Sequence, residues 1–358
     1  MKIPALTIFS HIPMVEKVLF TRHLAIMVKT GIPITEALDT LMEQTKSGLF
    51  KRTIRSMLTD VQNGKPLGTA MQKHPYVFSP LEISLVEIGE EAGVLEENLH
   101  FLTTQLEKEL SLKKKVQGAL IYPAIVFSLT FFMSMGIAIF ILPRVIDLFS
   151  GLNVELPITT RILLYIANLL QDHGFIILIG GILLVVLTGF AWRLKQVKPV
   201  THRVLLHTPI IGTFIRNVQL ARLSRSLGTL IKSGVPINRS IDITARTLTN
   251  VVYQKSLYVA TKSISAGNSL TGSIGAFSPN LYPVITIKMI QVGEKSGRLD
   301  ETLLYLADFY EEEVENMSKN LTTLLEPALL IFLGVVVAFV ALAIIGPIYS
   351  LTGSISGQ

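Results

Sequence analysis

Residues 118–142 read GALIYPAIVFSLTFFMSMGIAIFIL, and this stretch decides the fold class because it contains no charged side chain. A helix of this length spans about 37 Å at roughly 1.5 Å per residue, more than the roughly 30 Å of hydrocarbon in a bilayer. The whole chain of 358 residues has only 16% charged residues and a mean hydropathy of +0.52, whereas charged residues make up about a quarter of an ordinary soluble domain. The stretch therefore predicts a membrane-spanning helix.

Two further stretches have the same character. Residues 175–192, FIILIGGILLVVLTGFAW, are uncharged and end in Trp192, a residue type that suits the headgroup interface. Residues 327–345, PALLIFLGVVVAFVALAII, are followed by Pro347 and a short polar tail. The start of the chain lacks the pattern of a cleaved signal peptide. We expect three spans that insert without such a peptide.

The distribution of basic residues predicts the orientation of these spans. Lys and Arg number 14 in residues 1–119, 2 in residues 143–173 and 16 in residues 193–324, and basic residues accumulate on the cytosolic side. Both large polar segments are therefore expected in the cytosol of a multi-pass protein. The predicted organisation is an N-terminal segment (1–18), a cytosolic helical domain (19–117), a transmembrane helix (118–142), an extracytoplasmic loop (143–174), a second transmembrane helix (175–192), a second cytosolic helical domain (193–324), a third transmembrane helix (325–346) and an extracytoplasmic tail (347–358).

The two cytosolic segments resemble each other in sequence. KTGIPI at 29–34 recurs as KSGVPI at 232–237, and GEEAGVL at 89–95 recurs as GEKSGRL at 293–299. Further matches at nearly constant spacing pair Arg22 with Arg225, Gly64 with Gly267, residues 78–80 with 277–279, Pro123 with Pro327, and Pro143 with Pro347. Two unrelated segments would not share so many landmarks in the same order. The predicted fold is an all-α membrane protein with two repeated cytosolic helical bundles and three transmembrane helices.

The first repeated motif has the residue types of a corner between helices. A Gly just past a helix end adopts the left-handed conformation, and a Pro in the first turn of the next helix loses no hydrogen bond. Gly31 and Pro33, and likewise Gly234 and Pro236, are therefore interpreted as structural turns. A ligand-binding turn is the alternative.

The second repeated motif carries acidic residues between two glycines. It comprises Gly89, Glu90, Glu91 and Gly93 in the first segment, and Gly293, Glu294 and Gly297 in the second. One interpretation is a turn whose carboxylates lie favourably near the N-terminus of the next helix. The others are contact with a basic partner and a hard-cation site, for which the oxygen ligands are too few.

A long helix is predicted to follow each acidic turn. Apolar residues recur at helical spacing in both segments, and no helix breaker precedes Gly118 or Pro327. Each helix is expected to continue into the membrane as a stiff rod, with a kink where proline removes a backbone hydrogen bond. Four prolines are predicted membrane hinges: Pro123, Pro143, Pro327 and Pro347.

The sequence carries no motif for catalysis. It has no cysteine, no P-loop, no GxSxG, no HExxH and no GxGxxG, which are the patterns that hold phosphates, nucleophiles, metals or dinucleotides. In residues 1–119 the 14 basic residues face 13 acidic ones, so the chain offers no basic stripe for nucleic acid. We expect no enzyme activity, no catalytic residue, no cofactor and no metal.

The doubled motifs around Arg22, Gly31 and Gly89, and their second set around Arg225, Gly234 and Gly293, resemble those of the inner-membrane platform proteins of type IV pilus assembly and type II secretion. The resemblance covers residues 19–349. It implies a multi-pass protein of the bacterial cytoplasmic membrane that self-associates and meets other inner-membrane assembly proteins. The implied partners are a separate hexameric secretion or pilus ATPase and pilins or pseudopilins.

The resemblance also suggests which residues meet a partner. The candidates are Arg22, Arg225, Glu90, Glu91 and Glu294. Two features depart from the family pattern. The segment before Leu19 is short, as in the competence-pilus type. In the first copy Ala92 precedes the second glycine, whereas the family more often has a small polar residue there, as Ser296 is in the second copy. A transporter and a membrane-tethered scaffold remain the alternative classes, and the choice between pilus, secretion and DNA uptake stays open.

Overall fold

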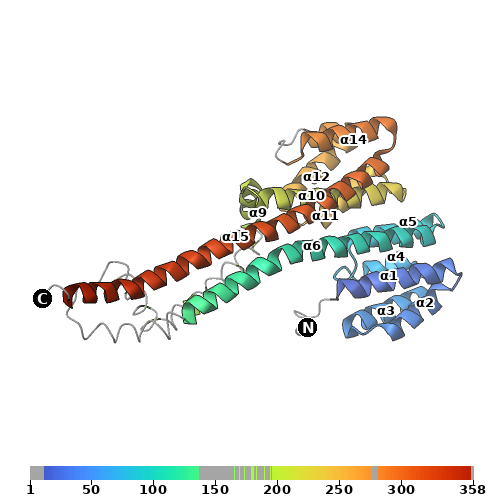
Figure 1. Ribbon diagram of the computed structural model, residues 1–358. Coiled ribbons are helices and arrows are strands. Elements are labelled where there is room, and N and C mark those ends of the chain that lie inside the picture. Colours follow the sequence, from blue (N-terminus) through green and yellow to red (C-terminus); the bar gives the residue numbers. More distant parts are fainter. Residues whose placement is uncertain are drawn as a thin grey trace. The chain divides into compact units, whose positions relative to one another are not determined.

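The computed structural model describes residues 12–136, 196–275 and 281–355, with isolated positions between 165 and 194 (Figure 1). The described residues contain helices and turns but no strand. The chain divides into two compact units, of which the first comprises Met1–Lys115 with Pro199–Glu315 and the second Val116–Lys198 with Asn316–Gln358. Both predicted cytosolic segments thus contribute to the first unit.

Two sets of helices make up the first unit. The first bundle contains α1 (Met14–Lys29), α2 (Ile34–Gln44), α3 (Gly48–Gln62), α4 (Leu67–Gln72), α5 (Pro80–Glu91) and the start of α6 (Leu95–Gly136). After α9 (Lys198–His207), the second bundle contains α10 (Ile211–Lys232), α11 (Ile237–Thr247), α12 (Val251–Ser265), α13 (Leu270–Gly275), α14 (Val284–Ser296) and the start of α15 (Leu299–Ile355).

The helix boundaries keep the spacing that the predicted repeat requires. The helices α2, α3 and α4 begin 203 residues before α11, α12 and α13, and α5 and α6 begin 204 residues before α14 and α15. The connection before α14 is therefore one residue longer than the connection before α5. Each helix of one bundle has a counterpart at a defined position in the other.

The turns between helices use glycine at equivalent places. Gly31 and Gly234 have φ values of 81° and 82°, which L-residues with a side chain rarely adopt. The N–H groups of Gly31 and Ile32 donate to the carbonyls of Val28 and Met27, both at 3.0 Å, and so close the end of α1. Pro33 and Pro236 lie at the N-cap positions of α2 and α11, one residue before the predicted first turn.

The cores of the two bundles differ in chemistry. In the first bundle, the rings of Phe50 and Phe78 lie 6.4 Å apart, next to Phe20. In the second, the rings of Tyr253 and Tyr282 lie 5.6 Å apart. These tyrosines follow Phe50 and Phe78 by 203 and 204 residues, so the same two places are filled by more polar rings.

This correspondence corrects one predicted match. The sequence pairs Phe78-Ser79-Pro80 with residues 277–279, which lie outside the described residues. In the structure Ser79 and Pro283 are the N-caps of α5 and α14, so the counterpart of Phe78 is Tyr282. The predicted match was wrong because it relied on three identical residues and not on the distance to the start of the following helix.

The helices that leave the bundles continue through the predicted hinges. Pro123 lies within α6, and Pro327 and Pro347 lie within α15. The second of these helices extends to Ile355, past the predicted end of the third span. Pro143 and most of the second predicted span lie outside the described residues.

One helix of the described part is long and apolar enough to cross a membrane, at Leu95–Met133. Only 7% of its most apolar window is buried, unlike the core helix of a soluble protein. The helix contains residues 118–133 of the first predicted span (118–142), and residues 137–142 lie outside the described residues.

Candidate functional site

The acidic turns hold the ends of short helices. Glu90, in the last turn of α5, accepts hydrogen bonds from the backbone N–H groups of Leu67 (2.6 Å) and Gly68 (2.7 Å) at the start of α4. Glu294 accepts from the N–H groups of Leu270 (2.6 Å) and Thr271 (3.1 Å) at the start of α13, and from the Thr271 hydroxyl (2.7 Å). The first N–H groups of a helix have no partner within the helix, and each carboxylate supplies one.

The first glycine of each motif permits a close approach of two helices. Gly89 and Gly293 lie within α5 and α14, not in loops. A Cβ added at Gly89 would lie 3.0 Å from Cα of Leu95, and one at Gly293 would lie 2.8 Å from Cβ of Thr302. The second glycines, Gly93 and Gly297, each have φ of 71° and follow the helix end.

This geometry corrects the predicted role of the acidic residues. The carboxylates of Glu90 and Glu294 lie at the starts of α4 and α13, more than twenty residues earlier in the chain, and not at the next helix as the sequence suggested. Glu91 is exposed. Among the described residues, no group of three or more His, Asp or Glu side chains is arranged to hold a metal ion.

The two arginines occupy equivalent places with different surroundings. Arg22 of α1 donates to Glu107 of α6, with Nε 3.1 Å from Oε1, and both side chains are partly exposed. Arg225 of α10 is buried and donates to Glu311 (2.9 Å) and to Asp308 of α15. Glu311 follows Glu107 by 204 residues, so each bundle joins its first and last helix through the same ion pair.

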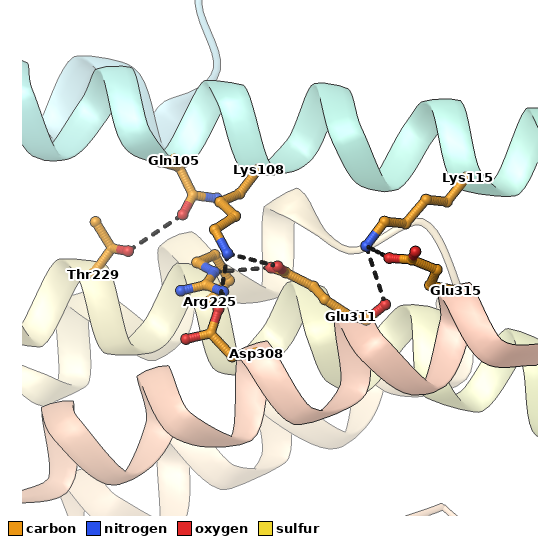
Figure 2. Close-up of polar contacts among 8 residues, drawn as sticks. All are labelled: Gln105, Lys108, Lys115, Arg225, Thr229, Asp308, Glu311 and Glu315. Carbon is orange, nitrogen blue, oxygen red and sulfur yellow. Dashed lines mark hydrogen bonds and ion pairs between the residues drawn. The ribbon is translucent and has the colours of Figure 1, made fainter.

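A second set of contacts joins α6 to the second bundle (Figure 2). The ammonium group of Lys108 lies 2.9 Å from Asp308 and 3.3 Å from Glu311, the same carboxylates that bind Arg225. Thr229 of α10 donates to Gln105 at 3.2 Å. Two further ion pairs and a cation–π contact complete the set: Lys115 with Glu315 (2.8 Å), Arg222 with Glu109 (2.7 Å), and Lys232 over the ring of Phe101 (5.4 Å).

The charges in this cluster stabilise one another. Burial alone would lower the pKa of Lys108, but the carboxylates of Asp308 and Glu311 outweigh it and hold the pKa above its ordinary value. Burial alone would raise the pKa of Asp308, but hydrogen bonds from Lys108 and Arg225 outweigh it and hold that pKa below its ordinary value. Each charge in the cluster therefore favours the ionised form of its oppositely charged neighbours.

Sequence reasoning missed these contacts between α6 and the second bundle. Lys108 and Lys115 lie seven residues apart on one side of α6, and Asp308, Glu311 and Glu315 lie on one side of α15 at helical spacing. Such complementary stripes are a detectable signal. The partners are about 200 residues apart, so neither stripe identifies the other.

The fold and these sites define a class of protein: an all-helical chain of two equivalent bundles, each of which ends in a long helix that continues past the bundle. Comparison with known families agrees with this doubling. The family model described as "Type II secretion system (T2SS), protein F" matches the chain twice, at residues 20–143 and 223–347. The chain belongs to this family.

Curated relatives match along almost the whole chain. The type IV pilus assembly protein PilC of Thermus thermophilus is 34% identical over 344 residues, which cover 95% of this chain and 83% of the relative. PilC of Myxococcus xanthus is 32% identical, with 94% and 80% covered. The type II secretion system protein F of Xanthomonas campestris is 30% identical, with 94% and 82% covered.

Proposed function

We propose that this chain is a non-enzymatic inner-membrane platform that couples a separate cytosolic ATPase to the assembly or retraction of pilin-like subunits. The observation that carries the proposal is the doubled family match, because each match begins at a helical bundle and includes the helix that continues past it. The relatives' names, which refer to type IV pilus assembly and type II secretion, support the same role.

The proposal includes a membrane topology. The two bundles, interpreted as products of an internal duplication, face the cytosol, and three spans at 118–142, 175–192 and 325–346 cross the bacterial inner membrane. The apolar helix at Leu95–Met133 supports the first span. The even number of crossings between the bundles gives both the same orientation, as the basic residues require.

The contacts within the first unit suggest how force from a motor would be received. Ion pairs of α6 and α15 connect the first bundle to the second through Lys108, Asp308 and Arg225. A push on one bundle would therefore be transmitted to the other, and both would act on the helices that continue past them. Of the predicted partner contacts, Glu91 is exposed and lies beside the cap of α4, and it is the residue we assign to the ATPase contact.

The topology can be tested with single cysteines because the native chain has none. Tyr76→Cys, at a fully exposed position of the first bundle, should react with a membrane-impermeant maleimide only after the cells are opened. Asn153→Cys, in the predicted extracytoplasmic loop, should react in spheroplasts. Labelling of Tyr76→Cys from outside would overturn the orientation.

The coupling role can be tested with the full-length tagged chain in its native membrane. We expect a hexameric secretion or pilus ATPase to co-purify, Glu91→Arg to reduce its recovery several-fold, and the exposed control Glu43→Arg to leave it unchanged. Deletion of the gene should abolish fibre assembly or secretion. Normal fibres and normal secretion in the deletion strain would refute the platform role.

A further inference from the structure

The two bundles expose different parts of what is otherwise an equivalent surface. On α10, Thr229 contacts Gln105 of the first bundle and is only 6% exposed. Its counterpart on α1, 203 residues earlier, is Ile26, which is 53% exposed. The surface of α10 that receives α6 thus has an uncovered equivalent on α1, which we call the receiving face.

The opposite surface shows the same relation in reverse. Phe101 and Gln105 of α6 contact the second bundle, and Gln105 is buried. Their counterparts on α15, 204 residues later, are Tyr305 and Phe309, which are 62% and 42% exposed. On α14, the exposed residues Ile285 and Val292 replace Leu81 and Ile88 of α5, which are buried or half-buried. These four residues form the presenting face: Ile285, Val292, Tyr305 and Phe309.

The receiving face is already hollowed. A groove of about 430 Å³ on the first bundle is lined by Ala25, Ile26, Lys29, Glu96, Glu97 and His100. The counterparts of Ile26 and Lys29 are Thr229 and Lys232, the residues that contact Gln105 and Phe101. The groove therefore lies where an aromatic residue of a second presenting face would be received.

The residues on the two uncovered faces match as pairs. Inside the molecule the polar Thr229 meets the polar Gln105, whereas the equivalent uncovered pair is Ile26 and Phe309, both apolar. Lys232 over Phe101 corresponds to Lys29 and Tyr305, which preserves a cation and an aromatic ring. Two of the equivalent pairs on the uncovered faces are therefore complementary, Ile26 with Phe309 and Lys29 with Tyr305.

The charges at the equivalent positions differ from those inside the molecule. Inside the molecule Lys108 faces Arg225 together with two carboxylates, those of Asp308 and Glu311. The equivalent position on α15 is Glu312, and the receiving face offers Arg22 with one carboxylate, Glu107, because Thr104 takes the place of Asp308. A lysine that faces one arginine and two carboxylates is thus replaced by a glutamate that faces one arginine and one carboxylate, and Arg22 is the group there that Glu312 would attract. Three equivalent pairs are not oppositely charged, in contrast to the ion pairs Arg222–Glu109, Lys115–Glu315 and Arg239–Glu87: they are Leu19 with Glu313, Ser111 with Lys319, and Glu36 with Gln291.

We infer that the presenting face of one molecule docks on the receiving face of a second molecule of this chain, which repeats between molecules the contact that joins the two bundles within one. The occupant we assign is a second copy, because it carries Tyr305 and Phe309 at the positions equivalent to those of Phe101 and Gln105, which contact the equivalents of the groove residues Lys29 and Ile26. Such a head-to-tail contact repeats from one molecule to the next and forms a closed ring or an open filament, according to the rotation between neighbours. The inference stands independently of the proposed function, since it concerns self-association alone.

Cysteine cross-linking in native membranes tests this contact, since the chain has no competing thiol. One tagged chain carries Ile26→Cys and a second, differently tagged chain carries Phe309→Cys. On oxidation we expect a disulfide-linked dimer that contains both tags, at least tenfold more abundant than with the control pair Tyr76→Cys and Phe309→Cys. Gln105→Cys with Thr229→Cys in one chain should cross-link internally and calibrates the reaction.

A charge exchange provides a second readout that needs no cysteine. In detergent, sedimentation should show that Glu312→Arg shifts the chain towards monomer and that the double variant R22E/E312R restores the oligomer. Cross-linking of Ile26→Cys mainly to itself would show a symmetric contact and overturn the inference. Unchanged sedimentation of Glu312→Arg, or occupation of the groove by a pilin or an ATPase in place of a second copy, would also overturn it.

Discussion

Removal of the Glu90 carboxylate should destabilise the first bundle. In Glu90→Ala, the N–H groups of Leu67 and Gly68 lose acceptors at 2.6 and 2.7 Å, and Leu67 is fully buried. Loss of a helix cap costs about 0.5–2 kcal/mol, and hydrogen bonds to a charged group contribute about 1.5–3 kcal/mol each. Because Glu90 is half-buried, water replaces part of this interaction, and we expect a loss of about 2 kcal/mol.

The assay is thermal unfolding of the full chain in detergent, followed by far-ultraviolet circular dichroism at one scan rate. A loss of about 2 kcal/mol corresponds to a fall in Tm of roughly 4–8 °C for a unit of about 230 residues. Glu90→Gln retains one acceptor oxygen but turns an amide NH₂ towards a backbone N–H, so its Tm should lie between those of Glu90→Ala and the native chain. The exposed neighbour Glu91→Ala should stay within about 0.5 kcal/mol.

The second bundle supplies a replicate of this experiment. Glu294→Ala removes the equivalent acceptor and additionally leaves the Thr271 hydroxyl without its 2.7 Å partner, so its Tm should fall at least as far. The reasoning is refuted if Glu90→Ala keeps the native Tm but abolishes binding of a partner protein. That result would return Glu90 to the role of a contact residue.

Three further predictions concern the core and the charge cluster. Gly293→Ala should lower the free energy of unfolding by about 1–3 kcal/mol, because the new Cβ would lie 2.5 Å from Oγ1 of Thr302. The control is Gly48→Ala, where the new Cβ would have no atom within 4 Å. Equal Tm values for the two variants would contradict the packing argument. Tyr253→Phe should lower the free energy of unfolding by about 1–3 kcal/mol, because the buried hydroxyl of Tyr253 donates to the carbonyl of Leu281 at 2.6 Å. Tyr258 is more exposed, and Tyr258→Phe should leave the stability nearly unchanged. An unchanged stability in Tyr253→Phe would show that this hydrogen bond adds nothing. The pKa of Asp308 is lower in the folded chain than its ordinary value of 3.8. Its carboxylate therefore stabilises the fold above that pH, and this stabilisation is lost as the pH falls through the folded pKa, so the Tm difference between the native chain and Asp308→Asn should shrink below pH 4. A Tm difference that does not change with pH would exclude this dependence on the ionisation of Asp308.

Local rules predicted the features that depend on local backbone geometry. The corners at Gly31 and Gly234 follow from the φ preference of glycine, and the long helices follow from apolar residues at helical spacing without a breaker. The same local rule predicts hinges at Pro123 and Pro327, and both residues lie within the long helices α6 and α15. A proline costs one hydrogen bond, and a long helix can retain its other bonds around it.

The contacts that sequence reasoning missed depend on distant parts of the chain. Glu90 caps a helix that begins 23 residues earlier, and Lys108 meets Asp308 across 200 residues. Neither partner is visible in a local pattern, because loop lengths and packing angles bring them together. The correspondence of Phe78 with Tyr282 was missed because the two residues occupy equivalent positions in the cores but are different amino acids.

The difference between the aromatic cores bears on how a chain with two similar bundles avoids exchanging their parts during folding. Tyr253 needs the carbonyl of Leu281, and Tyr282 needs the hydroxyl of Ser256 at 2.7 Å. If α12 were inserted between the helices of the first bundle, Tyr253 would bring an additional hydroxyl group to the place that Phe50 fills, and an overpacked core costs about 1–3 kcal/mol. The phenol groups thus favour the packing of each helix in its own bundle.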